Sequence, residues 1–131
     1  MAMLMATTNE VPGYTTTRML GEVFGVTVRR LDFGNTLTAG FSSMGGGEVP
    51  QLTSLVVQSR NQAMGRLVEA ARRRGANAVV GMRFDTGDMS GSLSEICAYG
   101  TAVWVEPATE EARAQYAGMV EAGRVPATPP H

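Results

Sequence analysis

The fold of this chain is decided by residues 75–86, which read Gly-Ala-Asn-Ala-Val-Val-Gly-Met-Arg-Phe-Asp-Thr. This stretch joins a predicted long helix to a predicted strand with almost no spare residues. Gly75 can adopt the left-handed conformation that ends many helices. Beyond it, apolar side chains stand at every second position, which predicts a strand whose apolar row faces the helix: Ala78, Val80, Met82 and Phe84. The stretch predicts an architecture but contains no catalytic or metal-binding constellation.

The helix before this strand is predicted over residues 50–74, which is about seven turns. Pro50 suits the first helical position because its missing N–H would be unpaired there. Apolar and small residues then recur at helical spacing as far as Ala71. A second apolar stripe lies beside the first and consists of Val57, Met64 and Val68. We therefore expect one face of the helix to pack on a sheet and the other on a neighbouring subunit.

The N-terminal part of the chain is rich in threonine and β-branched residues, which favour strands. Residues 14–20 and 22–30 are predicted as two strands separated by Gly21. The second has one apolar and one polar face, because alternate positions differ in polarity: Val26 and Val28 against Thr27 and Arg29.

A further strand is predicted over residues 93–105, and Pro107 ends the sheet. Both faces of this strand could be covered by other parts of the protein, which indicates a central position in the sheet or a place at a subunit interface. Residues 33–44 could form a short helix, but two glycines weaken that interpretation.

The predicted organisation is a single domain with additions at both ends. Residues 1–13 lack periodicity and are predicted as a flexible leader, and residues 14–106 form the domain. Residues 107–123 contain a C-terminal helix that Thr109 can cap, with one apolar side formed by Tyr116, Met119 and Val120. Residues 124–131 are rich in proline and are predicted as a disordered tail.

Composition excludes several classes of protein. Of 131 residues 44% are hydrophobic and 18% charged, a thin polar surface for a free monomer, which points to buried subunit contacts. The formal charge is −1, so no basic excess is left for nucleic acid or an anionic membrane. The single cysteine, Cys97, excludes an intramolecular disulfide. With neither a signal-peptide pattern nor a run of about 20 apolar residues, we expect a soluble, cytoplasmic protein.

Several pieces of the sequence occur in an order that resembles the YbjQ-like family. They are Gly21-Glu22-Val23 at the start of a strand, the long helix, residues 75–81, and Tyr99-Gly100-Thr101-Ala102-Val103. The family comprises small bacterial and archaeal proteins labelled "putative heavy-metal-binding domain". The resemblance covers roughly residues 15–105, and the last two motifs together are fairly specific.

The resemblance implies an α+β protomer with an antiparallel sheet and one long packed helix. It also implies assembly as a cyclic homo-oligomer, a pentamer or a pair of pentamers (a decamer), with no established activity. One segment departs from the family pattern. The family's long helix opens with charged residues, whereas residues 49–58 are uncharged here. This difference puts any ligand assigned to that charged surface in doubt.

The metal-binding label finds little support in the residue types. Soft metals prefer thiolate and imidazole ligands, but Cys97 is alone and the only histidine is His131. We therefore predict no metal site within one protomer, although a symmetric oligomer could gather one Cys97 from each subunit. Asp85, Asp88 and Glu95 do not match a calcium loop and are predicted to form a solvated acidic turn.

Three other motifs are explained without a ligand. Ser42 is one residue short of a G-x-S-x-G nucleophile motif and has no internal histidine as a base. Residues 45–47 are glycines that could present N–H groups to an anion, but no lysine follows and a turn explains them. Residues 72–74 are arginines that favour the negative end of the helix dipole.

We therefore predict a non-catalytic homo-oligomer whose partner is itself, with no cofactor and with neither catalytic nor metal-binding residues. A small ligand could bind where subunits meet. The predicted interface residues are Val57, Met64, Val68, Arg83, Tyr99 and Trp104.

Two alternatives stay open. The first is a metal-binding protein, as the family label implies. The second is a small enzyme whose inter-subunit site would draw on Ser42, Arg83, Asp85 and Glu95.

Overall fold

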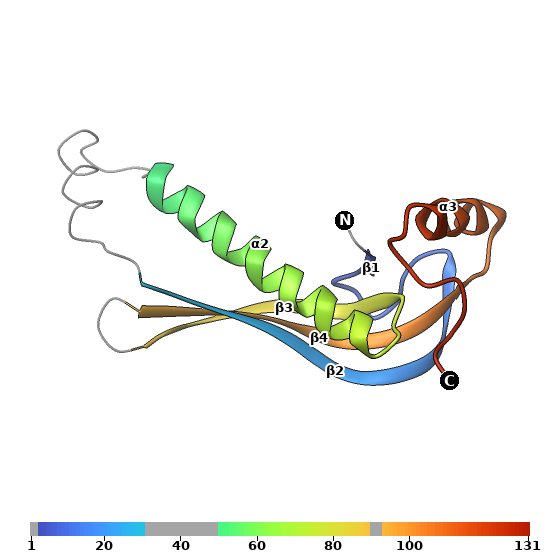
Figure 1. Ribbon diagram of the computed structural model, residues 1–131, viewed down its shortest axis with the longest axis horizontal. Helices are drawn as coiled ribbons and strands as arrows, with labels where there is room; N and C mark the ends of the chain where they lie inside the picture. Colours follow the sequence, from blue (N-terminus) through green and yellow to red (C-terminus); the bar gives the residue numbers. More distant parts are fainter. Residues whose placement is uncertain (1–2, 31–49, 90–92) are drawn as a thin grey trace.

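The protein is described by a computed structural model over residues 3–30, 50–89 and 93–131. Its elements are β1 (Leu4–Met5), β2 (Tyr14–Arg30), α2 (Pro50–Arg73), β3 (Ala78–Asp88), β4 (Leu93–Pro107) and α3 (Glu110–Glu121). The strands form one sheet in the order β1-β3-β4-β2, with α2 along one face and α3 at the end opposite the start of α2 (Figure 1). No helix in these ranges is long and apolar enough to cross a membrane.

The sheet is mixed rather than antiparallel throughout. β4 is central and pairs antiparallel with both β2 and β3. A central position was one of the two predicted for this strand. β1 instead runs parallel to the start of β3, with Leu4 opposite Ala78 and Met5 opposite Val79. The α+β class with one long packed helix is confirmed, and the all-antiparallel sheet is corrected because the N-terminal segment adds a parallel edge.

β2 is one continuous strand, so the predicted break at Gly21 is wrong. The ladder with β4 shifts register between Thr16 and Arg18 and again between Met19 and Gly21. Gly21 has φ of 104°, a conformation that glycine adopts without a steric cost. Each bulge inserts an extra residue and the pairing then resumes, so the glycine bends the strand without ending it.

The apolar row predicted for β3 is only partly right, because a bulge divides it between the two faces of the sheet. The register with β4 shifts between Val80 and Arg83, and Gly81 within the shift has φ of 62°. Before the bulge, Val79 packs in the core under α2, whereas Ala78 and Val80 belong to a second cluster. An extra residue exchanges the faces of all later side chains, and Met82 and Phe84 therefore return to the α2 side as predicted.

The main core lies between α2 and the sheet, where Ala63, Leu67 and Ala71 meet Ala98 and Ala102. The predicted helix is confirmed at both ends, by Pro50 and by Gly75 with φ of 80°. Its buried residues begin only at Ser59 and continue with Ala63, Leu67, Val68 and Ala71. The first turns of α2 are therefore only partly covered by the described part of the chain, with Leu52 and Leu55 half-buried.

A second core lies on the opposite face of the sheet, near α3. It contains Leu4, Val11, Ala78, Val80, Val103 and Val105, with Tyr116 and Met119 of α3 packed against it. α3 begins where predicted, because the Thr109 hydroxyl accepts a hydrogen bond from the Ala112 N–H at 3.0 Å. The C-terminal helix is thus an integral part of the domain.

The segments at both ends of the chain are packed, contrary to the flexible leader and disordered tail predicted for them. Met3 is fully buried, and the Gly81 N–H donates to the Thr8 carbonyl at 2.8 Å. In the tail, Val125 is buried and Arg18 Nη1 donates to the Pro130 carbonyl at 2.6 Å. The sequence lacked local signals here because the partners of these residues are far away along the chain.

The buried side chain of Asn77 connects β4 to the C-terminal helix α3. Its amide donates to the Val105 carbonyl at 2.7 Å and to the Tyr116 hydroxyl at 3.0 Å, and its oxygen accepts from the Val105 N–H at 2.8 Å. The Tyr116 hydroxyl donates in turn to the Pro126 carbonyl at 2.6 Å. Burial raises the pKa of Tyr116, and the hydrogen bond from Asn77 partly offsets this rise.

We predict that Tyr116→Phe lowers the free energy of unfolding by about 1 kcal/mol, because the Pro126 carbonyl loses its donor. A raised folded pKa means that the phenol stabilises the fold fully below its unfolded pKa, near 10.0, and that this contribution is lost as the pH rises through the folded value. Urea denaturation at neutral and alkaline pH measures both effects. A Tyr116→Phe variant that is as stable as the wild type at neutral pH would contradict the assignment.

A glycine in β2 allows the closest approach of α2 to the sheet. A Cβ atom at Gly25 would overlap the α2 backbone at Ala63 and Leu67. We therefore predict that Gly25→Ala lowers the free energy of unfolding by about 1 to 3 kcal/mol, since the helix must move away from the sheet. Gly65→Ala on α2 has open space around its Cβ and should instead raise stability by up to about 1 kcal/mol. Urea denaturation of both variants tests the contact; similar behaviour of the two would refute it.

Candidate functional site

The candidate site is the sheet face that points away from α2. Because Gly25 lies against α2, the neighbouring residues of β2 face the other way: Phe24, Val26 and Val28. Phe24 is 63% exposed and Val28 50% exposed. This arrangement is unusual, because the polar residue between two of these apolar ones, Thr27, is buried on the α2 side. β2 therefore turns its more apolar face outward.

The strand register places residues of β4 and β3 directly beside these positions. Phe24 lies opposite Tyr99, and Tyr99 lies opposite Arg83 on the other side. Val26, Cys97 and Asp85 form the next row, and Val28, Glu95 and Gly87 the third. We call these residues the open face: Phe24, Val26, Val28, Arg83, Asp85, Glu95, Cys97 and Tyr99.

Charge on the open face is concentrated along β3 and the distal part of β4. Arg83 is committed to the fold, because its Nη1 donates to the carbonyls of Thr7 at 2.6 Å and Met82 at 2.9 Å. Burial raises the pKa of the Cys97 thiol, and the carboxylates of Glu95 and Asp85 raise it further. The raised pKa favours the neutral thiol, which is less nucleophilic than the thiolate and must lose its proton to bind a metal.

The described residues do not form a heavy-metal centre within one chain. In residues 3–30, 50–89 and 93–131 no cluster of three or more His, Cys, Asp or Glu side chains could hold a metal ion. Cys97 would supply the sole soft ligand, beside the hard carboxylates of Asp85 and Glu95. Soft metals prefer several thiolate or imidazole ligands, so this donor set does not fit them.

The six residues predicted for an interface lie in three places. Arg83 and Tyr99 lie side by side on the open face, and Tyr99 is 44% exposed. Val57 is 51% exposed on α2, and Met64 is partly buried on the same helix. Val68 and Trp104 are already buried by the chain itself. Among the described residues, the Trp104 Nε1 has no hydrogen-bond partner.

The other candidate site residues named from the sequence do not come together in one site in the described structure. Ser42 and residues 45–47 lie outside the described part of the chain. Asp85 and Glu95 share the open face with Cys97, but Asp88 pairs with Ser94 toward the end of the hairpin. Of the three arginines that end α2, Arg74 fixes the helix to β2 by donating from Nη1 to the Leu20 carbonyl at 2.8 Å.

Sequence reasoning missed the apolar contribution of β2 to this surface. The alternation of Val26 and Val28 with Thr27 and Arg29 was visible, but an alternating pattern does not say which face is turned inward. Phe24 continues the apolar row and was the available signal. The glycine that follows it could have indicated the side on which another element approaches closely.

We predict that calorimetric titration with zinc or cadmium gives no heat that depends on Cys97. The wild-type protein and Cys97→Ala should give the same trace, because one neutral thiol beside carboxylates does not make a soft-metal site. Saturable binding at a fixed stoichiometry per oligomer, lost in Cys97→Ala, would show instead that several copies pool their thiols.

Comparison with known proteins agrees with the architecture. The family model YbjQ, described as "Putative heavy-metal-binding", matches residues 3–106. A UPF0145 protein of Streptomyces griseus is 57% identical over 99 residues, covering 76% of this chain and 82% of the relative. A UPF0145 protein of Acidothermus cellulolyticus is 52% identical over 103 residues, covering 79% of this chain and 95% of the relative.

Among solved structures, a protein of unknown function from the DUF74 family of Pediococcus pentosaceus has a similar fold. The TM-score is 0.54 at 15% sequence identity, covering 81% of this chain and 100% of that one. The family match spans β1 to β4 and stops before α3. This protein therefore belongs to the YbjQ family of UPF0145 proteins, whose role is unknown, and carries a C-terminal helix beyond the matched region.

Proposed function

We propose that this protein acts as a non-catalytic homo-oligomer, a pentamer or a pair of pentamers, in which the open face of one copy packs against a neighbouring copy. A small ligand would bind where the copies meet. The observation that carries this proposal is the outward-facing apolar side of β2, with Phe24 and Val28 at least half exposed. Large exposed side chains gathered on one sheet face are typical of protein interaction sites.

β2 turns apolar side chains outward and a polar side chain, Thr27, inward. This orientation supports assembly more strongly than the exposure of Phe24 and Val28 alone. Thr27 and Ser59 are buried between β2 and α2, and in the described structure Thr27 Oγ1 lacks a hydrogen-bond partner there. A free monomer would be more stable with the polar side of the strand in water and the apolar side in the core. The opposite orientation is favourable if a second copy covers Phe24, Val26 and Val28.

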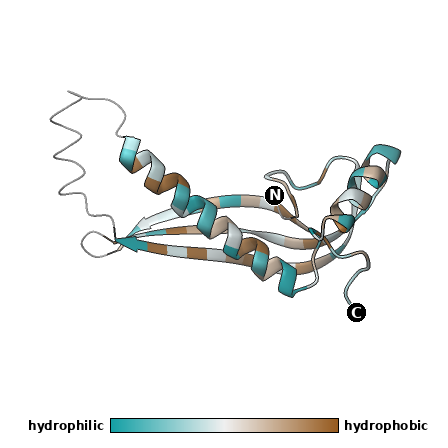
Figure 2. Ribbon diagram, turned by 45° about the horizontal axis from the view of Figure 1, so that its top comes forward, coloured by the Kyte–Doolittle hydropathy of each residue, from teal (hydrophilic) through white to brown (hydrophobic). Residues whose placement is uncertain are grey.

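The start of α2 offers a complementary surface. Val56 is 39% exposed and Val57 51% exposed, so each keeps a substantial part of its side chain open to solvent. Figure 2 shows apolar residues in the first turns of α2 and along the strands beneath it. The open face and the start of α2 are different surfaces of one protomer. Contact between unlike surfaces of successive copies closes into a ring when the rotation between them is suitable.

The energetics favour such a contact. Burial of apolar surface contributes about 25 cal/mol per Å², so covering Phe24, Val28 and Tyr99 from both sides can offset the cost of association. Asp85 on β3 and Glu95 on β4 lie beside this patch and can help to fix the relative orientation of the copies. The raised pKa of Cys97 supports a packing role for that thiol rather than a catalytic one.

We predict that the native mass of the protein is a multiple of the 13.9 kDa chain and that Phe24→Lys shifts it toward single chains. A lysine at the centre of an apolar contact would be buried without a partner, which costs several kcal/mol. Native mass spectrometry and sedimentation measure the assembly directly. Native mass spectrometry also retains a co-purifying small molecule and reports its mass.

The matched control is Thr15→Lys, which adds the same charge to an exposed position of the same strand. Thr15→Lys should leave the assembly intact. Circular dichroism of both variants checks that the fold is kept. A wild-type protein that stays a folded single chain at high concentration would refute the proposal, as would an unchanged assembly in Phe24→Lys.

A further inference from the structure

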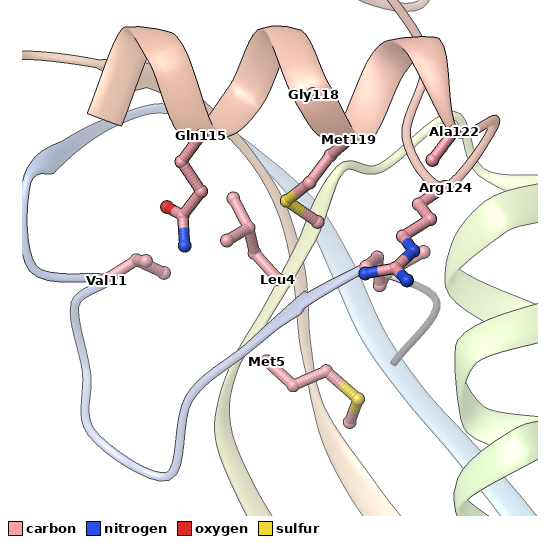
Figure 3. A pocket seen from close by; sticks show the side chains of 9 residues that line it. Leu4, Met5, Val11, Gln115, Gly118, Met119, Ala122 and Arg124 are labelled. Atoms are coloured by element: carbon pink, nitrogen blue, oxygen red, sulfur yellow. The ribbon is translucent and has the colours of Figure 1, made fainter. Parts of the chain in front are cut away.

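A cavity lies between α3 and the N-terminal segment, away from the open face. Its volume is about 580 Å³. One wall comes from Met3, Leu4, Met5 and Val11, and the other from Gln115, Gly118, Met119, Ala122 and Arg124 (Figure 3). Small-molecule sites in proteins commonly measure about 300 to 1,000 Å³. The cavity is therefore large enough for a compact organic ligand.

The lining is apolar along its length and polar at its two ends. Leu4 and Val11 are buried, and Met119 packs against the same cluster. Figure 3 shows Gln115 reaching from α3 toward Val11 at one end and Arg124 at the other, with Leu4 and Met119 between them. A ligand that spans the cavity would thus meet an apolar middle and a polar group at each end.

Gln115 can donate a hydrogen bond into the cavity. Its Oε1 accepts from the Tyr14 hydroxyl at 2.7 Å, which leaves the amide NH₂ group available. The same hydroxyl proton can instead point to the Ala112 carbonyl at 3.2 Å, which is the longer of the two contacts. Burial raises the pKa of Tyr14, and the neighbouring Tyr116 adds to this rise, so the phenol keeps its proton and remains a donor.

Arg124 supplies a positive charge at the other end. Its backbone N–H donates to the Met119 carbonyl at 2.9 Å, which fixes the turn that follows α3. Within the described residues the recorded ion pair is Arg72 with Glu69, and no carboxylate pairs with Arg124. A guanidinium binds a carboxylate through two parallel hydrogen bonds. An apolar cavity that ends at an unpaired guanidinium is complementary to an amphiphilic anion.

We infer that this cavity binds a small monocarboxylate with an aliphatic chain. The carboxylate pairs with Arg124, and the chain lies along Leu4 and Met119 toward Val11. One wall belongs to α3, which lies outside the family-matched residues 3–106. The site goes beyond the assembly proposed above and does not depend on it, because none of its lining residues belongs to the open face.

The test is calorimetric titration of the full chain with sodium decanoate. Gly118→Leu should weaken binding by at least about tenfold, because a Cβ at this position meets nothing within 4 Å and a leucine side chain would fill the cavity. This variant should keep its fold, since leucine favours a helix more than glycine does. Acetate, which lacks the chain, should bind more than about a hundredfold more weakly than decanoate.

Arg124→Gln tests the charge and should weaken decanoate binding by about two- to fivefold, since the Arg124 side chain is exposed to solvent. The matched control is Arg113→Gln, which removes the same charge from an exposed position of α3 outside the cavity. It should bind decanoate like the wild type. Binding that is unchanged in Gly118→Leu, or reduced equally by both arginine variants, would overturn the inference. Native mass spectrometry of the same samples reports the assembly, so a failure of one proposal is distinguishable from a failure of the other.

Discussion

The structure depends on the direct contact between the backbone of α2 and Gly25 of β2. Since no side chain other than hydrogen fits between them, this glycine decides which face of β2 is turned to the helix. Residues alternate along a strand, so the same contact directs Phe24, Val26 and Val28 outward. The exposed apolar surface is thus a consequence of close helix packing. A protomer that packs α2 this tightly is left with an apolar sheet face that a second copy can cover.

The glycine bulges have a complementary effect on the other strands. Alternation along β3 places Val79 in the core under α2 and Val80 in the core near α3, and the bulge at Gly81 then brings Met82 onto the same side as Val79. A regular strand would have placed later residues on the wrong faces. Gly100 opposite the bulge is needed for a related reason, because a Cβ there would lie 2.7 Å from Val79 Cγ1. One short sheet therefore supports two cores with different partners.

Local signals in the sequence were sufficient for the helices. Pro50, Gly75 and the Thr109 cap all act within a few residues of their own position, and the structure confirms each of them. The bulges, the parallel edge strand and the packed tail depend on partners far away in the sequence, and periodicity alone does not report such partners. For the candidate site, Tyr99 and Arg83 were named in advance. Phe24 was missed because alternation does not distinguish inside from outside.

The open face and the cavity under α3 belong to different parts of the chain. The open face is built wholly from residues within the matched region 3–106. The cavity needs α3, which is attached through Asn77 and Tyr116. Asn77 is buried, and its amide and oxygen also pair with β4. A residue of the core therefore anchors the added helix.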